Sequence, residues 1–177
     1  MTESKTIGIV YSTVDGHTLK ICKFISEILT KLGWNVELHD ISSFDKDITS
    51  YSKFIIGASV RYGKHNKYVE QFILNHNKEL EHVDAAFFSV NLVARKTEKN
   101  SAETNPYVIK FLNQITWKPR TVGVFAGRLD YASYSFFDSL MIKLIMKITK
   151  GPTKSEKPIE FTNWSRVEAF AKLVVEG

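Results

Sequence analysis

The chain has 177 residues, of which 44% are hydrophobic and 24% are charged, and this composition excludes wholesale disorder and fibrous repeats while fitting one globular domain. A formal charge of +5 favours anionic partners, but the absence of zinc-finger spacing, an aromatic RNA-binding motif and a long basic tract argues against nucleic acid. The lone cysteine, Cys22, excludes an internal disulfide, and no apolar run approaches the roughly 18 residues that a membrane-spanning helix needs.

The first part of the chain has the pattern of a strand, a turn, a helix and a second strand. Lys5–Tyr11 is rich in β-branched residues, and Thr18–Leu32 carries apolar residues at helical spacing. Gly33 is typical of a helix stop, and Trp34–His39 alternates as a strand does. The opening apolar stretch is too short for a secretory signal peptide, so we expect a cytoplasmic protein with at most peripheral membrane contact.

Three later segments have the character of buried strands. Lys53–Ala58 and Ala85–Val90 are nearly continuous apolar runs, as expected of strands covered on both faces, and Arg120–Ala126 makes a fifth strand. Helical patterns over Lys67–Leu80 and Pro106–Ile115 lie between them. The alternation predicts an α/β fold with a doubly wound five-stranded parallel sheet and helices on both faces.

A last helix is expected after Thr162 or Asn163, either of which can cap it. In sheets of this kind, ligands bind beyond the carboxyl ends of the strands, where the strand order switches. Three loops therefore become candidates for a binding site: Ser12–Thr18, Ser59–Lys64 and Asn91–Lys96.

The first of these loops, Ser12–Thr18, resembles an anion-binding turn. A helix N-terminus presents unpaired N–H groups and the positive end of the helix dipole, so it can hold a phosphate without a lysine or arginine. Neither G-x-x-x-x-G-K-[ST] nor G-x-G-x-x-G is present, which favours a mononucleotide. Asp15, inside the turn, is also compatible with simple capping of the first helix in an ordinary connection, so the residues alone leave both interpretations open.

The turn also resembles the flavodoxin phosphate loop, Ser/Thr-x-Thr-Gly-x-Thr, in which Thr13, Gly16 and Thr18 match and Asp15 stands where threonine is usual. Nearly the whole chain is similar to the flavodoxin-type, quinone-dependent protoporphyrinogen oxidases of bacterial haem synthesis, which also carry aspartate before the loop glycine. Three stretches carry this resemblance: IIGASVRYG (Ile55–Gly63), FFSVNLVARKTEK (Phe87–Lys99) and FDSLMIKLIMK (Phe137–Lys147).

The resemblance implies one flavodoxin-like domain over residues 1–177, with an amphipathic helical insertion at 127–157 after the fifth strand. It further implies an FMN cofactor and the oxidation of protoporphyrinogen IX to protoporphyrin IX in three two-electron steps, with menaquinone or ubiquinone as acceptor. An electron carrier and an NAD(P)H:quinone reductase remain as alternatives, although carrier flavodoxins are typically acidic. A receiver-type signalling domain shares the fold but lacks its acidic residues here, since Tyr11-Ser12 and Ser59-Val60 occupy their positions.

The resemblance also implies where FMN binds. We expect its phosphate over Thr13–Thr18, with the Asp15 carboxylate turned away from it to cap the helix. Tyr62 is the candidate for stacking on the flavin ring, and Gly63 permits close backbone approach. The full expected cofactor set is Ser12, Thr13, Val14, Asp15, Gly16, His17, Thr18, Ser59, Val60, Arg61, Tyr62, Gly63, Ser89, Asn91, Leu92, Val93, Ala94 and Arg95.

The substrate implied by the resemblance carries two propionates, which basic side chains can pair with. The candidates are Arg61, Lys64, Arg95, Lys96 and Arg128. No catalytic base can be named from the sequence. The five histidines have no metal-ligand spacing, so we expect no metal site.

The segment Tyr134–Lys150 follows the fifth strand and has no counterpart in a minimal flavodoxin. Its pattern predicts a helix with one broad apolar face and a lysine cluster opposite. This helix either packs into the core with a solvated lysine edge, or covers substrate at an anionic membrane surface where a lipid-soluble quinone is met. The second interpretation predicts peripheral association with the inner face of the cell membrane. The apolar face comprises Phe136, Phe137, Leu140, Met141, Leu144, Ile145 and Ile148, and the cluster comprises Lys143, Lys147 and Lys150.

Overall fold

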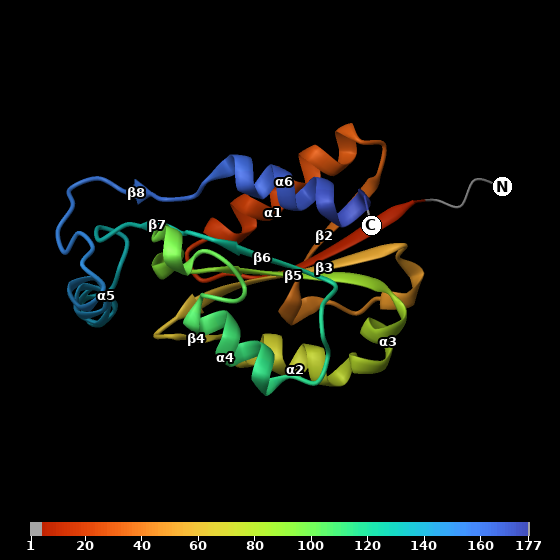
Figure 1. Cartoon of the computed structure of the whole chain (residues 1–177), viewed down its shortest axis with the longest axis horizontal. Coiled ribbons are helices and arrows are strands. Elements are labelled where there is room, and N and C mark those ends of the chain that lie inside the picture. The colour runs from red at the N-terminus through yellow and green to blue at the C-terminus, as the bar shows by residue number, and fades with distance from the viewer. Residues whose placement is uncertain (1–4, 177) are drawn as a thin grey trace.

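A computed structural model describes residues 5–176, and its centre is a parallel sheet between two helical layers (Figure 1). The ends of the expected domain, residues 1–4 and 177, lie outside the described residues. Neighbouring strands in the order β2-β1-β3-β5-β6 all pair in parallel, so the expected five-stranded doubly wound sheet is confirmed. Their bounds are β1 (Thr6–Ser12), β2 (Asn35–Asp40), β3 (Lys53–Arg61), β5 (Asp84–Val90) and β6 (Thr121–Phe125).

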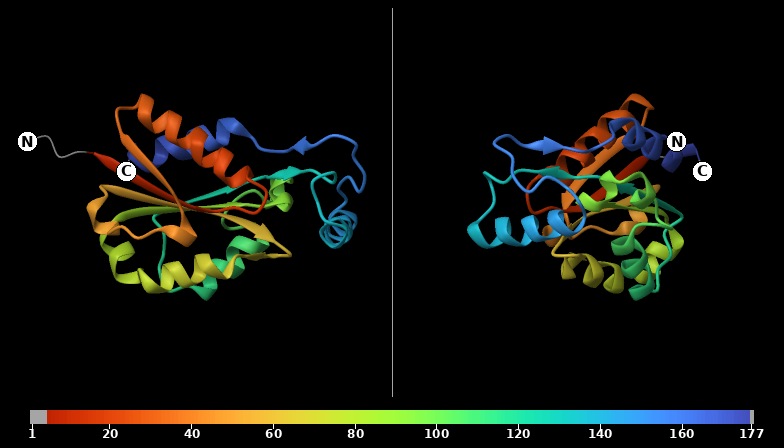
Figure 2. Two further views of the ribbon diagram at one scale, coloured as in Figure 1. Left: turned by 180° about the vertical axis from the view of Figure 1, so that it is seen from behind. Right: turned by 60° about the vertical axis from the view of Figure 1, so that its left-hand side comes forward.

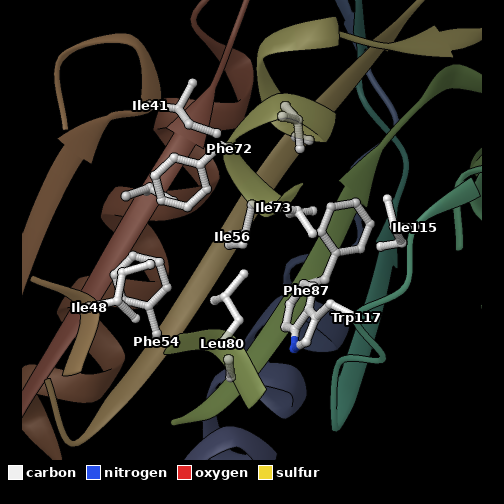
Figure 3. Close-up of a cluster of buried hydrophobic side chains, with 14 of the residues drawn as sticks. Ile41, Ile48, Phe54, Ile56, Phe72, Ile73, Leu80, Phe87, Ile115 and Trp117 are labelled. Atoms are coloured by element: carbon white, nitrogen blue, oxygen red, sulfur yellow. The ribbon is translucent and has the colours of Figure 1, made fainter. Parts of the chain in front are cut away.

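Helices cover both faces of this sheet (Figures 1 and 2). One face carries α1 (His17–Lys31) and α6 (Trp164–Glu176), and the other carries α2 (Lys67–Asn75), α3 (Asn77–His82) and α4 (Pro106–Gln114). Figure 3 shows the core beneath α2, α3 and α4, in which Phe54 of β3 stacks on Phe72 of α2 with their ring planes 8° apart. Burial of these alternating strand residues on both faces provides the main driving force for this layered arrangement.

The residues at which the helices begin and end are explained by local backbone and side-chain preferences. Gly33 adopts φ 87° just past α1, and the Asn163 side chain accepts a hydrogen bond from the Arg166 N–H, so the expected stop and the Asn163 cap are confirmed. The expected continuous helix over Lys67–Leu80 is wrong, because His76 leaves helical geometry at φ −111° and separates α2 from α3. Asparagines flank His76 on both sides, and asparagine is a weak former of helix interiors.

Several short elements were not expected from the sequence. β4 (Lys64–His65) folds back antiparallel on the end of β3, and β7 (Arg128–Leu129) pairs with β8 (Ile159–Glu160) in a separate ribbon. Four turns of 3₁₀-helix occupy loops: η1 (Ile41–Ser43), η2 (Ile48–Ser50), η3 (Leu92–Arg95) and η4 (Thr97–Lys99).

The β7-β8 ribbon brackets α5 (Phe136–Ile148), which confirms the helix expected over Tyr134–Lys150 to within two residues at each end. α5 stands beyond the carboxyl ends of the parallel strands, apart from the two helical layers (Figures 1 and 2). Across residues 5–176, no helix combines the length and apolar character needed to cross a bilayer.

Candidate functional site

A pocket lies at the carboxyl ends of β1, β3 and β5, where the three loops singled out from the sequence meet. α5 contributes Ile142 and Ile145 to its wall. The expected cofactor residues that line it are Thr13, Val14, Asp15, His17, Thr18, Ser59, Val60, Arg61, Tyr62, Gly63, Asn91, Leu92 and Val93. The pocket is also lined by residues that were not expected as cofactor contacts: Val90, Tyr107, Gly127, Arg128, Tyr134, Ile142 and Ile145.

Other expected contacts lie away from the pocket lining. Ser89 is fully buried and hydrogen-bonds to His65 at 2.8 Å, and Ala94 and Arg95 line a separate cavity. The Arg95 guanidinium donates to the carbonyls of Leu92 and Thr149, each at 2.8 Å, so it holds a loop together. Four more expected residues are also outside the lining, namely Ser12, Gly16, Lys64 and Lys96.

The start of α1 is an open helix N-terminus facing this pocket. Gly16 occupies the capping position at φ 78°, no side chain among residues 5–176 caps the helix, and the first helical hydrogen bond runs from the Lys20 N–H to the Gly16 carbonyl at 3.1 Å. The expectation that Asp15 caps α1 is therefore wrong. Its carboxylate instead reaches across the pocket to a cation, and the first N–H groups of the helix are left available to a ligand.

Two buried polar atoms at this helix start have no hydrogen-bond partner within the described part of the chain: Thr18 Oγ1 and His17 Nδ1. Thr18 is 1% exposed and His17 is 8% exposed, and both line the pocket. Leaving a buried polar atom unpaired costs about 1–3 kcal/mol, so such atoms commonly mark a ligand position. A hydroxyl and free N–H groups at the positive end of a helix fit a phosphate.

The Asp15 carboxylate pairs with Arg61, whose guanidinium also reaches Asp138 on α5. The Nη1 atom lies 3.0 Å from Asp15 Oδ2, and Nη2 lies 2.7 Å from Asp138 Oδ2. Burial opposes the charge of Arg61, but the two carboxylates outweigh it and raise the pKa of the guanidinium. Arg61, expected to bind a propionate, thus already has two acidic partners, because the fold brings both α5 and the loop before α1 to the end of β3.

Aromatic rings gather around Arg61 at the pocket rim. Its guanidinium carbon lies 5.7 Å from the ring centre of Tyr62 and 5.6 Å from that of Tyr134, within cation–π range. Tyr62 is 44% exposed and sits at φ 51°, with Gly63 at φ 73°. A side chain on Gly63 would lie 3.4 Å from the Tyr107 ring, so this tight hairpin turn also brings its backbone against α4.

α5 packs through a narrow stripe and exposes the rest of its apolar surface. Ile142 and Met146 are buried against Leu129, whereas the broad face expected from the sequence is largely open to solvent. That face is therefore not part of the core. Its exposed members are Phe136 at 88%, Phe137 at 63%, Leu140 at 56%, Leu144 at 51% and Ile148 at 71%.

The pocket lining holds one carboxylate, Asp15, which is paired with Arg61, and one imidazole, His17. Burial lowers the pKa of His65 to about 4, but its ring bonds to Ser89 and is outside the lining. Among residues 5–176, no cluster of three or more His, Cys, Asp or Glu side chains is arranged to hold a metal ion. The site thus offers anion binding and ring contacts, as a bound organic cofactor requires.

Comparison with known proteins shows which sequences this chain is similar to. The flavodoxin domain family matches residues 8–156. Protoporphyrinogen IX dehydrogenase [quinone] of Leishmania major is 46% identical over 166 residues, covering 92% of this chain and 71% of that protein. The Escherichia coli K12 protein of the same name is 38% identical over 165 residues, covering 93% and 91%.

Solved structures show the same fold. A Fusobacterium nucleatum flavodoxin bound to flavin mononucleotide superposes with a TM-score of 0.51 at 15% identity, covering 97% of this chain and 98% of that one. A short-chain flavodoxin associated with a bacterial microcompartment gives a TM-score of 0.52 at 16% identity, covering 97% of each chain.

Proposed function

The chain belongs to the flavodoxin domain family and, within it, to the quinone-dependent protoporphyrinogen IX dehydrogenases, and on this premise we propose that it oxidises protoporphyrinogen IX to protoporphyrin IX with FMN as cofactor and a quinone as acceptor. The observation that carries the proposal is the likeness to two such dehydrogenases over more than nine-tenths of this chain. The pocket at the carboxyl ends of the strands supplies a site of the required character.

The start of α1 is the proposed site of the FMN phosphate. Its open N–H groups, the Thr18 hydroxyl and the hydroxyl-bearing Thr13 support this placement. The repulsion between the Asp15 carboxylate and the phosphate is reduced, because the carboxylate forms an ion pair with Arg61. When bound, FMN supplies the redox chemistry by carrying electron pairs from the porphyrinogen to the quinone.

The loops after β3 and β5 are the proposed walls for the flavin ring. Tyr62 offers an exposed aromatic face at the rim, and Val93 and Tyr107 also line the pocket. Buried asparagines hold the second loop in place. Asn91 Oδ1 accepts hydrogen bonds from the Ala94 N–H and from Asn105 Nδ2, each at 3.0 Å. This preorganisation keeps the wall positioned without help from ligand.

For the propionates of the substrate, we propose Arg128 as the first partner and the exposed Lys64 as a second. Arg128 lines the pocket, and its guanidinium lies 2.9 Å from the Asp130 carboxylate, so it is held at the rim. Arg95 and Arg61 are less available, because each guanidinium already binds at least two protein groups, whereas Arg128 pairs with the single carboxylate of Asp130. Lys64 and Lys96 both lie outside the pocket lining, but Lys64 is exposed and directly follows the lining residue Gly63, whereas Lys96 is half-buried.

The segment 127–157 is the proposed insertion into a single flavodoxin-like domain, closed at its base by the β7-β8 ribbon. We further propose that the exposed apolar face of α5 meets the inner membrane surface, in which menaquinone or ubiquinone dissolves. Lys143 and Lys147, both exposed on the same helix, suit anionic headgroups.

A half-reaction tests the proposal. The FMN-loaded protein is mixed anaerobically with protoporphyrinogen, and the yellow flavin absorbance is followed before and after a quinone is added. We expect bleaching by porphyrinogen and recovery with quinone. Bleaching by NADPH but not by porphyrinogen would instead support an NAD(P)H:quinone reductase, and no bleaching by either would leave only an electron carrier.

A further inference from the structure

The side chain of His17 is fixed in one tautomer by Thr162. Thr162 Oγ1 donates its single hydrogen to the Ala126 carbonyl at 2.7 Å. The same oxygen lies 2.7 Å from His17 Nε2, and it has no second hydrogen to give, so it must accept there. His17 Nε2 therefore carries a hydrogen whether or not the ring is charged, and any further proton must go to Nδ1.

That remaining atom, Nδ1, is buried without a hydrogen-bond partner among the described residues, and the same is true of Thr18 Oγ1 on the next residue. In the neutral ring, Nδ1 holds a lone pair, which repels an anionic oxygen. In the charged ring, it becomes a second N–H donor. His17 is the first residue of α1, so the protonation state of Nδ1 changes the charge at the helix end where the phosphate is proposed to bind.

Four charged side chains from different parts of the fold act on the His17 ring. Lys20 belongs to the same helix, Asp15 to the preceding loop, Arg128 to β7 and Glu160 to β8. Lys20 and Glu160 lie 2.6 Å apart and act on the pKa of His17 in opposite directions, Glu160 raising it and Lys20 lowering it. The ring of Trp164, on α6, adds no charge at 6.3 Å.

The balance of these groups favours a neutral ring in the free protein. Burial is the largest influence and lowers the pKa of His17, while Glu160 and Asp15 act in the opposite direction. The free protein near neutral pH therefore presents a lone pair at Nδ1. A phosphate dianion at the helix start changes the balance, because it favours the charged form of a nearby imidazole.

We propose that His17 takes up one proton from solvent, at Nδ1, when the FMN phosphate binds, and that it then donates a charged hydrogen bond to that phosphate. This inference rests on the proposed FMN site. Because proton uptake is linked to FMN binding, the direction of the pH dependence of FMN affinity follows. Above the second phosphate ionisation, FMN affinity falls as pH rises between the pKa of His17 in the free protein and its higher pKa in the complex, by at most about tenfold per pH unit.

The test compares FMN with riboflavin, which lacks the phosphate, by titrating the apoprotein between about pH 6.5 and 8.5, above the second phosphate ionisation near ~6. The matched variant is His17→Gln, whose amide N–H can still donate to Thr162 but cannot be protonated. We expect the wild-type Kd for FMN to rise with pH. The variant should bind FMN more weakly at pH 6.5 and show no such rise, and riboflavin binding should not change with pH in either protein.

Calorimetry in two buffers of different ionisation enthalpy gives the proton count directly. We expect uptake of up to one proton per FMN by the wild type, and no uptake by the variant. If the variant does not fold, nitrogen NMR of labelled histidine in the wild-type protein shows whether the His17 ring becomes an imidazolium when FMN is added.

A neutral His17 ring in the complex, or equal pH dependence in both proteins, would overturn this inference and leave the FMN site standing. Failure of wild-type protein to bind FMN at any pH would overturn the proposed function, and the role of His17 with it.

Discussion

The Arg61 guanidinium lies 2.7 Å from the Asp138 carboxylate, and this ion pair ties the end of β3 to the first turn of α5. The same guanidinium holds Asp15 of the loop at the start of α1. One cation thus connects the proposed phosphate site with the inserted helix. The aspartate that departs from the usual flavodoxin loop has a structural role, since it is one of the two anions that hold Arg61 at the pocket.

Asp138→Asn should loosen α5 without affecting FMN binding. The exchange removes one charge from a partly exposed pair that contributes about 1 kcal/mol. We expect faster cleavage within 130–157 in limited proteolysis, lower kcat/KM for porphyrinogen and an FMN affinity within about twofold of wild type. Glu156→Gln, an exposed acid in the same segment, is the control. Equal proteolysis of the two variants would show that the ion pair does not hold α5.

Gly16→Val should impair FMN binding, because φ 78° is strained for a β-branched residue and the strain of about 1–3 kcal/mol falls in the phosphate loop. Gly33→Val is a matched control, since Gly33 has φ 87° and similarly open space at the far end of α1. Both variants should lose comparable stability in urea, while only Gly16→Val loses FMN affinity in fluorescence titration. Equal affinities would place the phosphate elsewhere.

Asp15→Thr, which restores the usual flavodoxin residue, should keep FMN bound. It should nevertheless free Arg61 from one of its two carboxylates. We expect FMN affinity within a few-fold of wild type, measured by flavin fluorescence, because Asp15 neither caps α1 nor is expected to contact the phosphate. A loss as large as that of Gly16→Val would mean that the carboxylate itself shapes the loop.

Arg128→Gln should weaken the use of porphyrinogen while sparing FMN. A well-formed charged hydrogen bond contributes about 1.5–3 kcal/mol, which corresponds to a loss of roughly tenfold or more in kcat/KM. Arg120→Gln is the control, since Arg120 lies before β6, at the opposite end of the sheet, with its side chain 64% exposed. Normal kinetics for Arg128→Gln would remove this residue as a propionate partner.

The double variant Phe136→Ser/Leu140→Ser should reduce binding to anionic liposomes in low salt, with FMN still bound. These substitutions avoid Ile142 and Met146, which pack against β7 and whose deletion would disturb the fold. The control, Leu74→Ser/Leu173→Ser, removes two exposed leucines from α2 and α6. Equal liposome binding by both double variants in a sedimentation assay would contradict membrane contact through α5.

The parallel sheet could be predicted because its signals are local. Apolar runs such as Lys53–Ala58 mark strands buried on both faces, and Gly33 marks the end of α1. The hairpin at Tyr62–Gly63 escaped prediction, because tyrosine rarely adopts the positive φ that this turn requires. The break at His76 was missed for a different reason, because the helical spacing of apolar residues continues on both sides of it.

The pocket was predicted only where its residues follow strands. Tyr107, Ile142 and Ile145 come from helices whose positions depend on tertiary packing, and no sequence pattern marks them as neighbours of β1. The partners that Arg61 and Arg95 find at α5 were missed for the same reason. Arg61 binds Asp138 and Arg95 binds the Thr149 carbonyl, and each partner is distant in sequence and is brought close only by the placement of α5 and its C-terminal end.

The most direct test is the stoichiometry of the complete reaction. Purified, FMN-loaded protein is given protoporphyrinogen and a quinone without oxygen, and porphyrin fluorescence and quinol formation are followed together against a protein-free control. We expect protein-dependent porphyrin formation with three quinols produced per porphyrin, since six electrons leave the substrate in pairs. Porphyrin formation no faster than in the control, in a protein that binds FMN normally, would contradict it.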